Sequence, residues 1–158
     1  MNKKNITIIL PLHKINDEYK EMLTNALKSA EDFHNDAIVM IVCPQDVKNE
    51  IDKIVTNDKL EIVYNVHTGD TDFCSQVNRG IQNCTTDWFT ILEVDDEFKS
   101  IWLKSMNEYM TNNPDVDVFL PVVKDINTEG QFVSFTNEST WAYGFTEKQG
   151  FLDNEIGR

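Results

Sequence analysis

Short apolar runs alternate along the chain with stretches in which apolar residues recur every three or four positions. The runs are rich in β-branched residues, as is typical of strands covered on both faces. The helical spacing between successive runs predicts one helix in each gap. Because strands that alternate with helices indicate βαβ units, we expect an α/β fold with a mostly parallel, Rossmann-like sheet flanked by helices. The expected strands are Ile6–Leu12, Ala37–Cys43, Leu60–Val66, Trp88–Leu92 and Val116–Val123.

The clearest amphipathic helix follows the first run. Asn16 is a suitable N-cap, and Asp17 and Glu18 stand in the first turn, where the helix dipole favours negative charge. The apolar positions of this helix continue as far as Phe33. The sequence therefore predicts a helix that begins directly after Asn16.

The C-terminal part of the sequence has a different pattern. Lys124–Gly130 is typical of a turn, and Gln131–Thr136 is predicted to be a further strand. The pattern of residues 137–158 predicts no element. We therefore divide the chain into an α/β domain at residues 1–123 and a hairpin with an irregular tail at residues 124–158.

Charge and cysteine content restrict the partners and the compartment. The net charge of −13 disfavours nucleic acid and anionic membrane surfaces, and an anionic ligand would need an accompanying cation. The three cysteines have no CxxC spacing, which suits a reducing compartment. No apolar stretch approaches the roughly 20 residues that a membrane span requires. We expect a soluble, cytoplasmic protein.

Three acidic residues follow the fourth predicted strand within the sequence Glu93-Val94-Asp95-Asp96. Ligands of open α/β sheets bind beyond the carboxyl ends of strands, where Pro11-Leu12-His13 also lies. Two carboxylates ~4 Å apart repel by about 4 kcal/mol at an effective dielectric constant near 20, and a divalent cation would offset that repulsion. The alternative is a solvated acidic loop whose charges cap the next helix.

Three segments together resemble the family 2 glycosyltransferases of the GT-A fold. Ile6–Pro11 is a strand that ends in proline, Asn78-Arg79-Gly80-Ile81 supplies an Asn-x-Gly helix segment, and Trp88–Asp96 is an apolar strand leading into a Glu-x-Asp version of the Asp-x-Asp motif. Their order and spacing match the family over residues 5 to about 123.

The resemblance implies a metal-dependent site for a nucleoside-diphospho-sugar, with a donor of the UDP type favoured. Asp95 corresponds to the metal-binding second acid of the motif, Glu93 to the first acidic position and Asp96 to the acid that often follows. The implied cofactor is Mn²⁺ or Mg²⁺. Glu93 stands where the family usually has Asp, so its side chain is one methylene longer.

The resemblance also implies a nucleotide pocket bordered by Pro11, Leu12 and His13, with Arg79 as a further donor contact. The family's basic residue before the helix asparagine is replaced by valine here, and Arg79 lies two positions on. The acidic pair that ends the family's second strand is also missing, since the corresponding residues are Val42–Gln45.

Two functions remain open from the sequence. The first is a glycosyltransferase that transfers a sugar to an acceptor that the sequence does not identify, in which residues 124–158 begin the acceptor-binding part; the residues identify no catalytic base. The second is a non-catalytic binding or assembly subunit with a GT-A fold, for example in a viral particle, which would act within an oligomer or with a partner protein.

Overall fold

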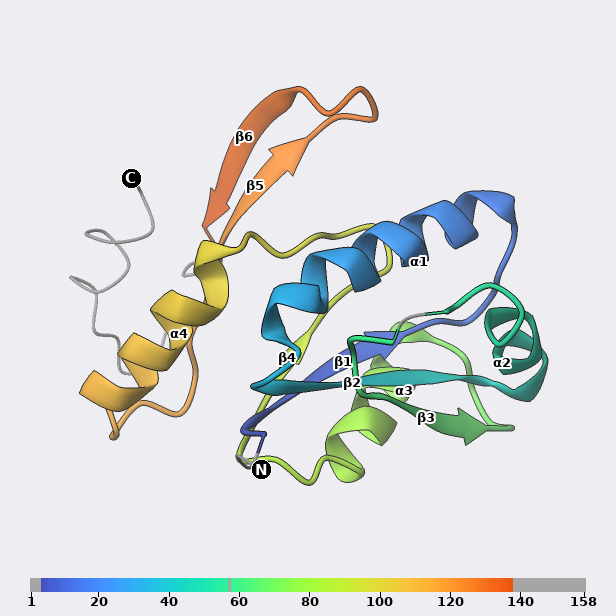
Figure 1. Ribbon diagram of the computed structural model, residues 1–158, viewed down its shortest axis with the longest axis horizontal. Coiled ribbons are helices and arrows are strands. Elements are labelled where there is room, and N and C mark those ends of the chain that lie inside the picture. Colours follow the sequence, from blue (N-terminus) through green and yellow to red (C-terminus); the bar gives the residue numbers. More distant parts are fainter. Residues whose placement is uncertain (1–3, 57, 138–158) are drawn as a thin grey trace. The chain divides into compact units, whose positions relative to one another are not determined.

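The computed structural model describes residues 4–56 and 58–137 (Figure 1). The chain forms two compact units, which divide between Asn107 and Glu108. The helix α4 (Ile101–Asn112) runs across this division. Among the described residues, no helix is both long and apolar enough to cross a membrane.

The first unit is built on a parallel sheet with the strand order β3-β2-β1-β4. The two central strands are the most deeply buried, and every residue of β1 is buried. The mostly parallel α/β fold expected from the sequence is confirmed. The strands are β1 (Ile6–Pro11), β2 (Ala37–Pro44), β3 (Ile62–His67) and β4 (Trp88–Ile91).

Helices connect the strands of this sheet. The predicted cap of α1 is confirmed, because the side-chain oxygen of Asn16 accepts a 2.9 Å hydrogen bond from the backbone N–H of Tyr19. The chain steps from β1 through β2 to β3 and then returns past β1 to β4. Right-handed crossovers therefore place α1 and α3 on opposite faces of the sheet, as Figure 1 shows. The connecting helices are α1 (Asp17–Ala30) with the short η1 (Glu31–Phe33), α2 (Gln45–Ile51) and α3 (Phe73–Gln82).

The helix α3 packs closely on the sheet at Gly80. A Cβ atom at this position would lie only 2.6 Å from Cγ2 of Ile9 in β1. Ile9 also belongs to a buried cluster with Met40 and Val42 of β2. Glycine therefore sets the distance between α3 and the centre of the sheet.

The second unit contains an antiparallel hairpin of β5 (Val122–Ile126) and β6 (Phe132–Asn137). The Asn127 side-chain oxygen accepts hydrogen bonds from the N–H groups of Glu129 and Gln131, which closes the turn. Gly130 adopts a positive φ of 75° there. The predicted turn and the strand after it are confirmed, although β5 continues to Ile126 before the turn begins.

The predicted strand Val116–Val123 is wrong over most of its length. The chain from Asp117 to Pro121 is irregular, and Val118 is 68% exposed. Pro121 has no N–H group to contribute to a strand ladder. The strand begins only after this proline. The irregular tail expected at the C-terminal end lies, from residue 138 on, outside the described residues.

Candidate functional site

The order of the strands reverses between β1 and β4, which lie side by side in the sheet. The backbone N–H of Leu92 donates a 2.9 Å hydrogen bond to the carbonyl of Ile9, so the pairing continues to the end of β4. The loop after β1 and the acidic segment after β4 therefore start from neighbouring strands, about 4.8 Å apart. Both segments begin at the edge of the sheet formed by the carboxyl ends of the strands. Open α/β sheets bind their ligands at this edge.

The acidic segment forms a turn at this edge. The backbone N–H of Asp96 donates a 3.1 Å hydrogen bond to the carbonyl of Glu93. The side chains of Glu93, Asp95 and Asp96 are exposed. The pKa of Glu93 is raised, mainly because the protein covers part of its carboxyl group. The charges of Asp96 and Asp95 nearby raise it further. The turn thus gathers negative charge that a cation would stabilise.

The chemistry of these acids suits a hard divalent cation, although they do not form a complete cage. Within residues 4–56 and 58–137, no three or more His, Cys, Asp or Glu side chains are grouped so as to hold a metal ion. Mg²⁺ is often bound by only one or two carboxylates, with substrate phosphates and water as the other ligands. Glu93 and Asp95 fit a site of that open kind.

The loop after β1 presents a mixed surface. Pro11 and Leu12 are buried, and the Leu12 N–H donates to the carbonyl of Val42, so only the remaining backbone of these residues can reach a ligand. His13 is exposed, and its ring meets that of Tyr19 edge-on at 5.9 Å between centroids. The ammonium group of Lys14 lies 4.8 Å from the same ring centroid. Two basic side chains of the loop after β1 thus contact an aromatic ring of α1.

Arg79 lies near the opposite end of the carboxyl edge. Its guanidinium donates a 2.5 Å hydrogen bond to the carbonyl of Asp70, in the loop after β3. The pKa of His67, the last residue of β3, is lowered mainly by burial. The charge of Arg79 lowers it further. Because β2 and β1 separate β3 from β4, roughly 14 Å separates these two strand ends. The structure does not bring Arg79 together with the acidic turn.

Two polar residues near this edge are not singled out by the sequence pattern. Gln76 of α3 is 1% exposed, and its Nε2 has no hydrogen-bond partner among the described residues. Neither ring nitrogen of His67 has a partner in the same part of the chain. A buried donor without a partner costs about 1–3 kcal/mol. The signal that could have found Gln76 is a polar residue on the apolar face of α3, beside Val77 and Gly80.

The fold is that of a mostly parallel α/β protein, with its acidic turn at the point where the strand order reverses. The family model for Glycosyl transferase family 2 matches residues 7–157, and the chain belongs to this family. The resemblance seen in the sequence is therefore confirmed. No curated protein matches the sequence.

Solved structures support the same fold at low sequence identity. TarS from S. aureus (residues 1–349) matches with a TM-score of 0.62 and 13% identity, over 82% of this chain and 38% of that chain. A 4-diphosphocytidyl-2C-methyl-D-erythritol synthase matches with a TM-score of 0.54 and 13% identity, over 97% and 85% of the two chains. The chain thus spans well under half of the TarS structure and has a glycosyltransferase-like fold.

Proposed function

We propose that the β1/β4 edge binds a nucleoside-diphospho-sugar through a divalent cation held by Glu93 and Asp95, and that the chain is the donor-binding part of a metal-dependent glycosyltransferase. The observation that carries this proposal is the acidic turn at the reversal point, where burial and then the charges of Asp96 and Asp95 raise the pKa of Glu93. Membership of Glycosyl transferase family 2 supports the sugar donor. The synthase of similar fold is named for a diphosphocytidyl compound, which supports a nucleotide ligand.

Electrostatics explain why a cation and a nucleotide would bind together. A chain with a net charge of −13 repels a diphosphate, and the acidic turn adds to that repulsion at short range. Glu93 and Asp95 would hold Mn²⁺ or Mg²⁺, which supplies a Lewis acid for the departing diphosphate. His13 and Lys14, in the loop after β1, would donate hydrogen bonds to the ligand. UDP is the diphosphate that we expect to bind best.

A thermal unfolding experiment tests this site. UDP with Mn²⁺, at roughly 100 times its Kd, should stabilise the chain by about 2.7 kcal/mol and raise the Tm by roughly 5–10 °C. UDP with EDTA should have no effect. Asp95→Asn should abolish the shift, since it removes a charged cation ligand without changing the size of the side chain.

The matched control is Asp58→Asn, which makes the same charge change at an exposed position outside the acidic turn. This variant should keep the full shift. An equal shift in Asp95→Asn and in the parent would contradict the assignment of the site. The absence of any response to UDP, CDP, ADP or GDP with Mn²⁺ would favour the non-catalytic binding module.

A further inference from the structure

We propose that His67 and Arg79 form a pH-sensitive clasp, which holds the loop of residues 68–72 at neutral pH and releases it when His67 is protonated. This loop connects β3 to α3 and starts at the carboxyl edge of the sheet. The clasp uses neither Glu93 nor Asp95, and no metal or nucleotide takes part in it. Failure of the donor-site proposal would therefore leave this inference standing, and the reverse also holds.

Arg79 joins the loop to α3 and to β3. Its guanidinium donates a hydrogen bond to the backbone carbonyl of Asp70. The same group lies against Gly69, where an added Cβ atom would be only 2.5 Å from Nη2. The backbone carbonyl of Arg79 in turn accepts a 3.1 Å hydrogen bond from the side-chain amide of Asn65 in β3. One residue thus connects the loop, the helix and the strand.

His67 lies beside this contact, with its polar atoms away from solvent. Asn65 and His67 are two positions apart in β3, so both side chains stand on the face of the sheet that α3 covers. Both ring nitrogens of His67 are buried, and neither has a hydrogen-bond partner within residues 4–56 and 58–137. The positive charge of Arg79 acts on the ring. The site thus suits a neutral imidazole and has no acceptor in place for a protonated one.

Protonation changes what this ring requires. A neutral imidazole has one donor and one acceptor, whereas an imidazolium has two donors and a positive charge. Burial, and then the charge of Arg79, lower the pKa of His67, so the clasped ring is neutral at pH 7. The backbone of Gly69 acts in the opposite direction and is the weakest of the three influences. Because the pKa is lower in the folded chain than in the unfolded one, the clasp is intact above about pH 6.5 and weakens as pH falls below that value.

The other charged groups around His67 do not offset the new charge. Arg79 and the exposed Cys74 are the titratable groups of α3, and the neighbouring strand β2 has a proline opposite His67. The loop carries two carboxylates, on Asp70 and Asp72, and both side chains are exposed. The carboxylate of Asp72 also caps the N-terminus of α3. Protonation therefore sets a second positive charge beside the guanidinium, while both carboxylates of the loop are in solvent.

The repulsion and the need for acceptors act on the same loop. The backbone of Gly69 favours the protonated ring, whereas the guanidinium holds the carbonyl of the next residue, Asp70. A protonated His67 therefore competes with Arg79 for the backbone of the loop. The guanidinium ends a flexible side chain, so it leaves Asp70 more readily than the strand moves, and the loop is then released.

An NMR titration of the full chain in EDTA, from about pH 7.5 to about pH 5, tests the clasp. The His67 ring, the amides of Gly69 and Asp70 and the guanidinium of Arg79 should all follow one transition, with a midpoint below about 6.5. After correction for pH, the guanidinium N–H groups should exchange with water roughly tenfold faster in the released state, because they lose their hydrogen bond.

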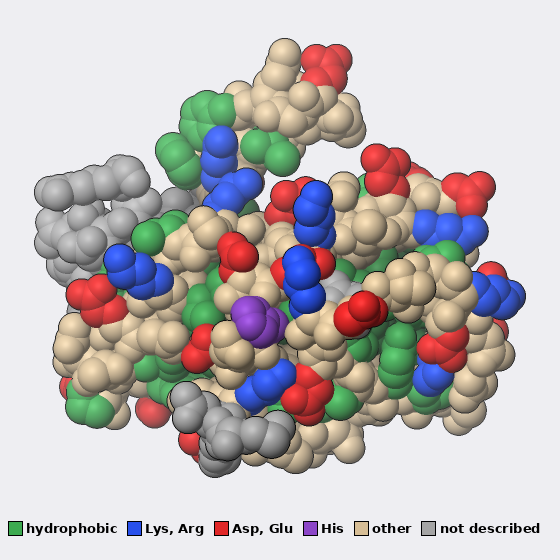
Figure 2. Space-filling view, viewed as in Figure 1, with side chains coloured by type: hydrophobic (Ala, Val, Ile, Leu, Met, Phe, Trp, Pro, Cys, Tyr) green, Lys and Arg blue, Asp and Glu red, His purple; other side chains and the backbone are tan. Residues whose placement is uncertain are grey.

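Three variants separate the clasp from general effects of charge. Acidic side chains are spread over the surface, as Figure 2 shows for one face, and acidification protonates them as well. His67→Gln keeps a neutral polar side chain and should remove the common transition, whereas His34→Gln, at an exposed histidine, should keep it. Gly69→Ala places a Cβ against the guanidinium, so the Arg79 and Asp70 signals at the upper pH should already match those of the parent at the lower pH.

The results distinguish the clasp from its alternatives. Loss of the transition in His67→Gln, together with its retention in His34→Gln, would support the proposal. A transition that persists in His67→Gln would assign the change to the surface carboxylates and overturn it. A His67 ring that titrates without any change at Asp70 or Arg79 would also overturn it, as would Gly69→Ala signals that match those of the parent at the upper pH.

Discussion

The central strand β1 and the hairpin strand β6 are both rich in apolar residues, yet their surroundings differ. Every residue of β1 is buried between helices and neighbouring strands. In β6, Phe132, Val133 and Phe135 are 54%, 61% and 63% exposed. The comparison shows that a local apolar pattern is enough to predict a strand, whereas burial depends on the elements that pack against it.

The largest effect should come from a cavity in the central sheet. Ile8 of β1 is completely buried, so Ile8→Ala removes three methyl or methylene groups from a packed interior. We expect a loss of about 2–5 kcal/mol in the free energy of unfolding. Urea denaturation followed by circular dichroism measures it.

The hairpin counterpart of this variant is Phe135→Ala. Because most of the Phe135 side chain is in contact with solvent, its removal should change the free energy of unfolding by less than about 0.5 kcal/mol. A loss above about 2 kcal/mol would show that another surface covers the hairpin in solution. That result would contradict the view that β6, unlike β1, is exposed to solvent.

A smaller effect should follow from filling the close contact between α3 and β1. Gly80→Ala gains about 1 kcal/mol of helix propensity but places a Cβ 2.6 Å from Cγ2 of Ile9. Overpacking of this kind costs about 1–3 kcal/mol, so we expect a net loss of up to about 2 kcal/mol. In an Ile9→Ala background the same substitution should be neutral or stabilising. A double-mutant cycle measures this coupling.

Gly130 in the hairpin turn is the comparison for Gly80. An added Cβ meets no atom within 4 Å there, but the φ of 75° disfavours residues with a side chain. Gly130→Ala should therefore weaken the turn through backbone strain alone, and Gly130→Asn should be tolerated better. Equal effects of Ala and Asn on the NMR signals of the hairpin would contradict this account of the turn.

The fold of the first unit could be predicted largely because its signals are local. Continuous β-branched runs identify β1 and β2, and Asn16 followed by acidic residues identifies the start of α1. The strand predicted at Val116–Val123 failed because Pro121 interrupts its ladder, and an apolar pattern alone does not reveal that interruption. Local patterns also give no distances between elements.

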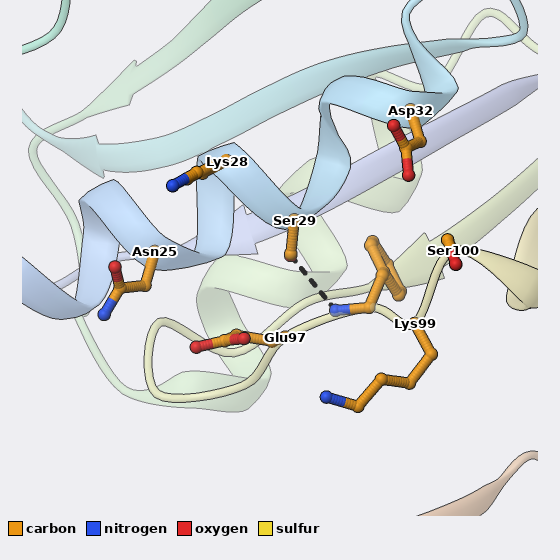
Figure 3. Close-up of a pocket in the computed structure, with 8 residues that line it drawn as sticks. Asn25, Lys28, Ser29, Asp32, Glu97, Lys99 and Ser100 are labelled. Atoms are coloured by element: carbon orange, nitrogen blue, oxygen red, sulfur yellow. Dashed lines mark hydrogen bonds between the residues drawn. The ribbon is translucent and has the colours of Figure 1, made fainter.

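The candidate site was predictable only in part for the same reason. The position of Glu93 and Asp95 directly after β4 places them beside the end of β1, since parallel strands end at one edge. The position of Arg79 near β3 depends on how α3 crosses the sheet. The helix α1 meets a segment about 70 positions away, as the bond between Phe98 and Ser29 shows (Figure 3), and no sequence spacing encodes that meeting.

The smallest predicted effect concerns pH and the acidic turn. Because the pKa of Glu93 is raised in the folded chain, its ionised form is less stable there than in the unfolded chain. The folded chain should therefore lose stability as pH rises through the range of this carboxyl group, and regain it on acidification. In EDTA, Glu93→Gln should be more stable than the parent at pH 7, and the difference should disappear below about pH 4.

The control separates this local effect on Glu93 from the charge of the whole chain. Glu129→Gln removes one carboxylate from the hairpin turn and so makes the same change in net charge. If both variants gained equally at pH 7, general repulsion within a chain of −13 would explain the gain and the acidic turn would have no special role. A gain confined to Glu93→Gln would instead show that burial and the nearby charges of Asp96 and Asp95 disfavour ionised Glu93 in the folded chain. Mn²⁺ added to the parent should then remove the difference between the two proteins.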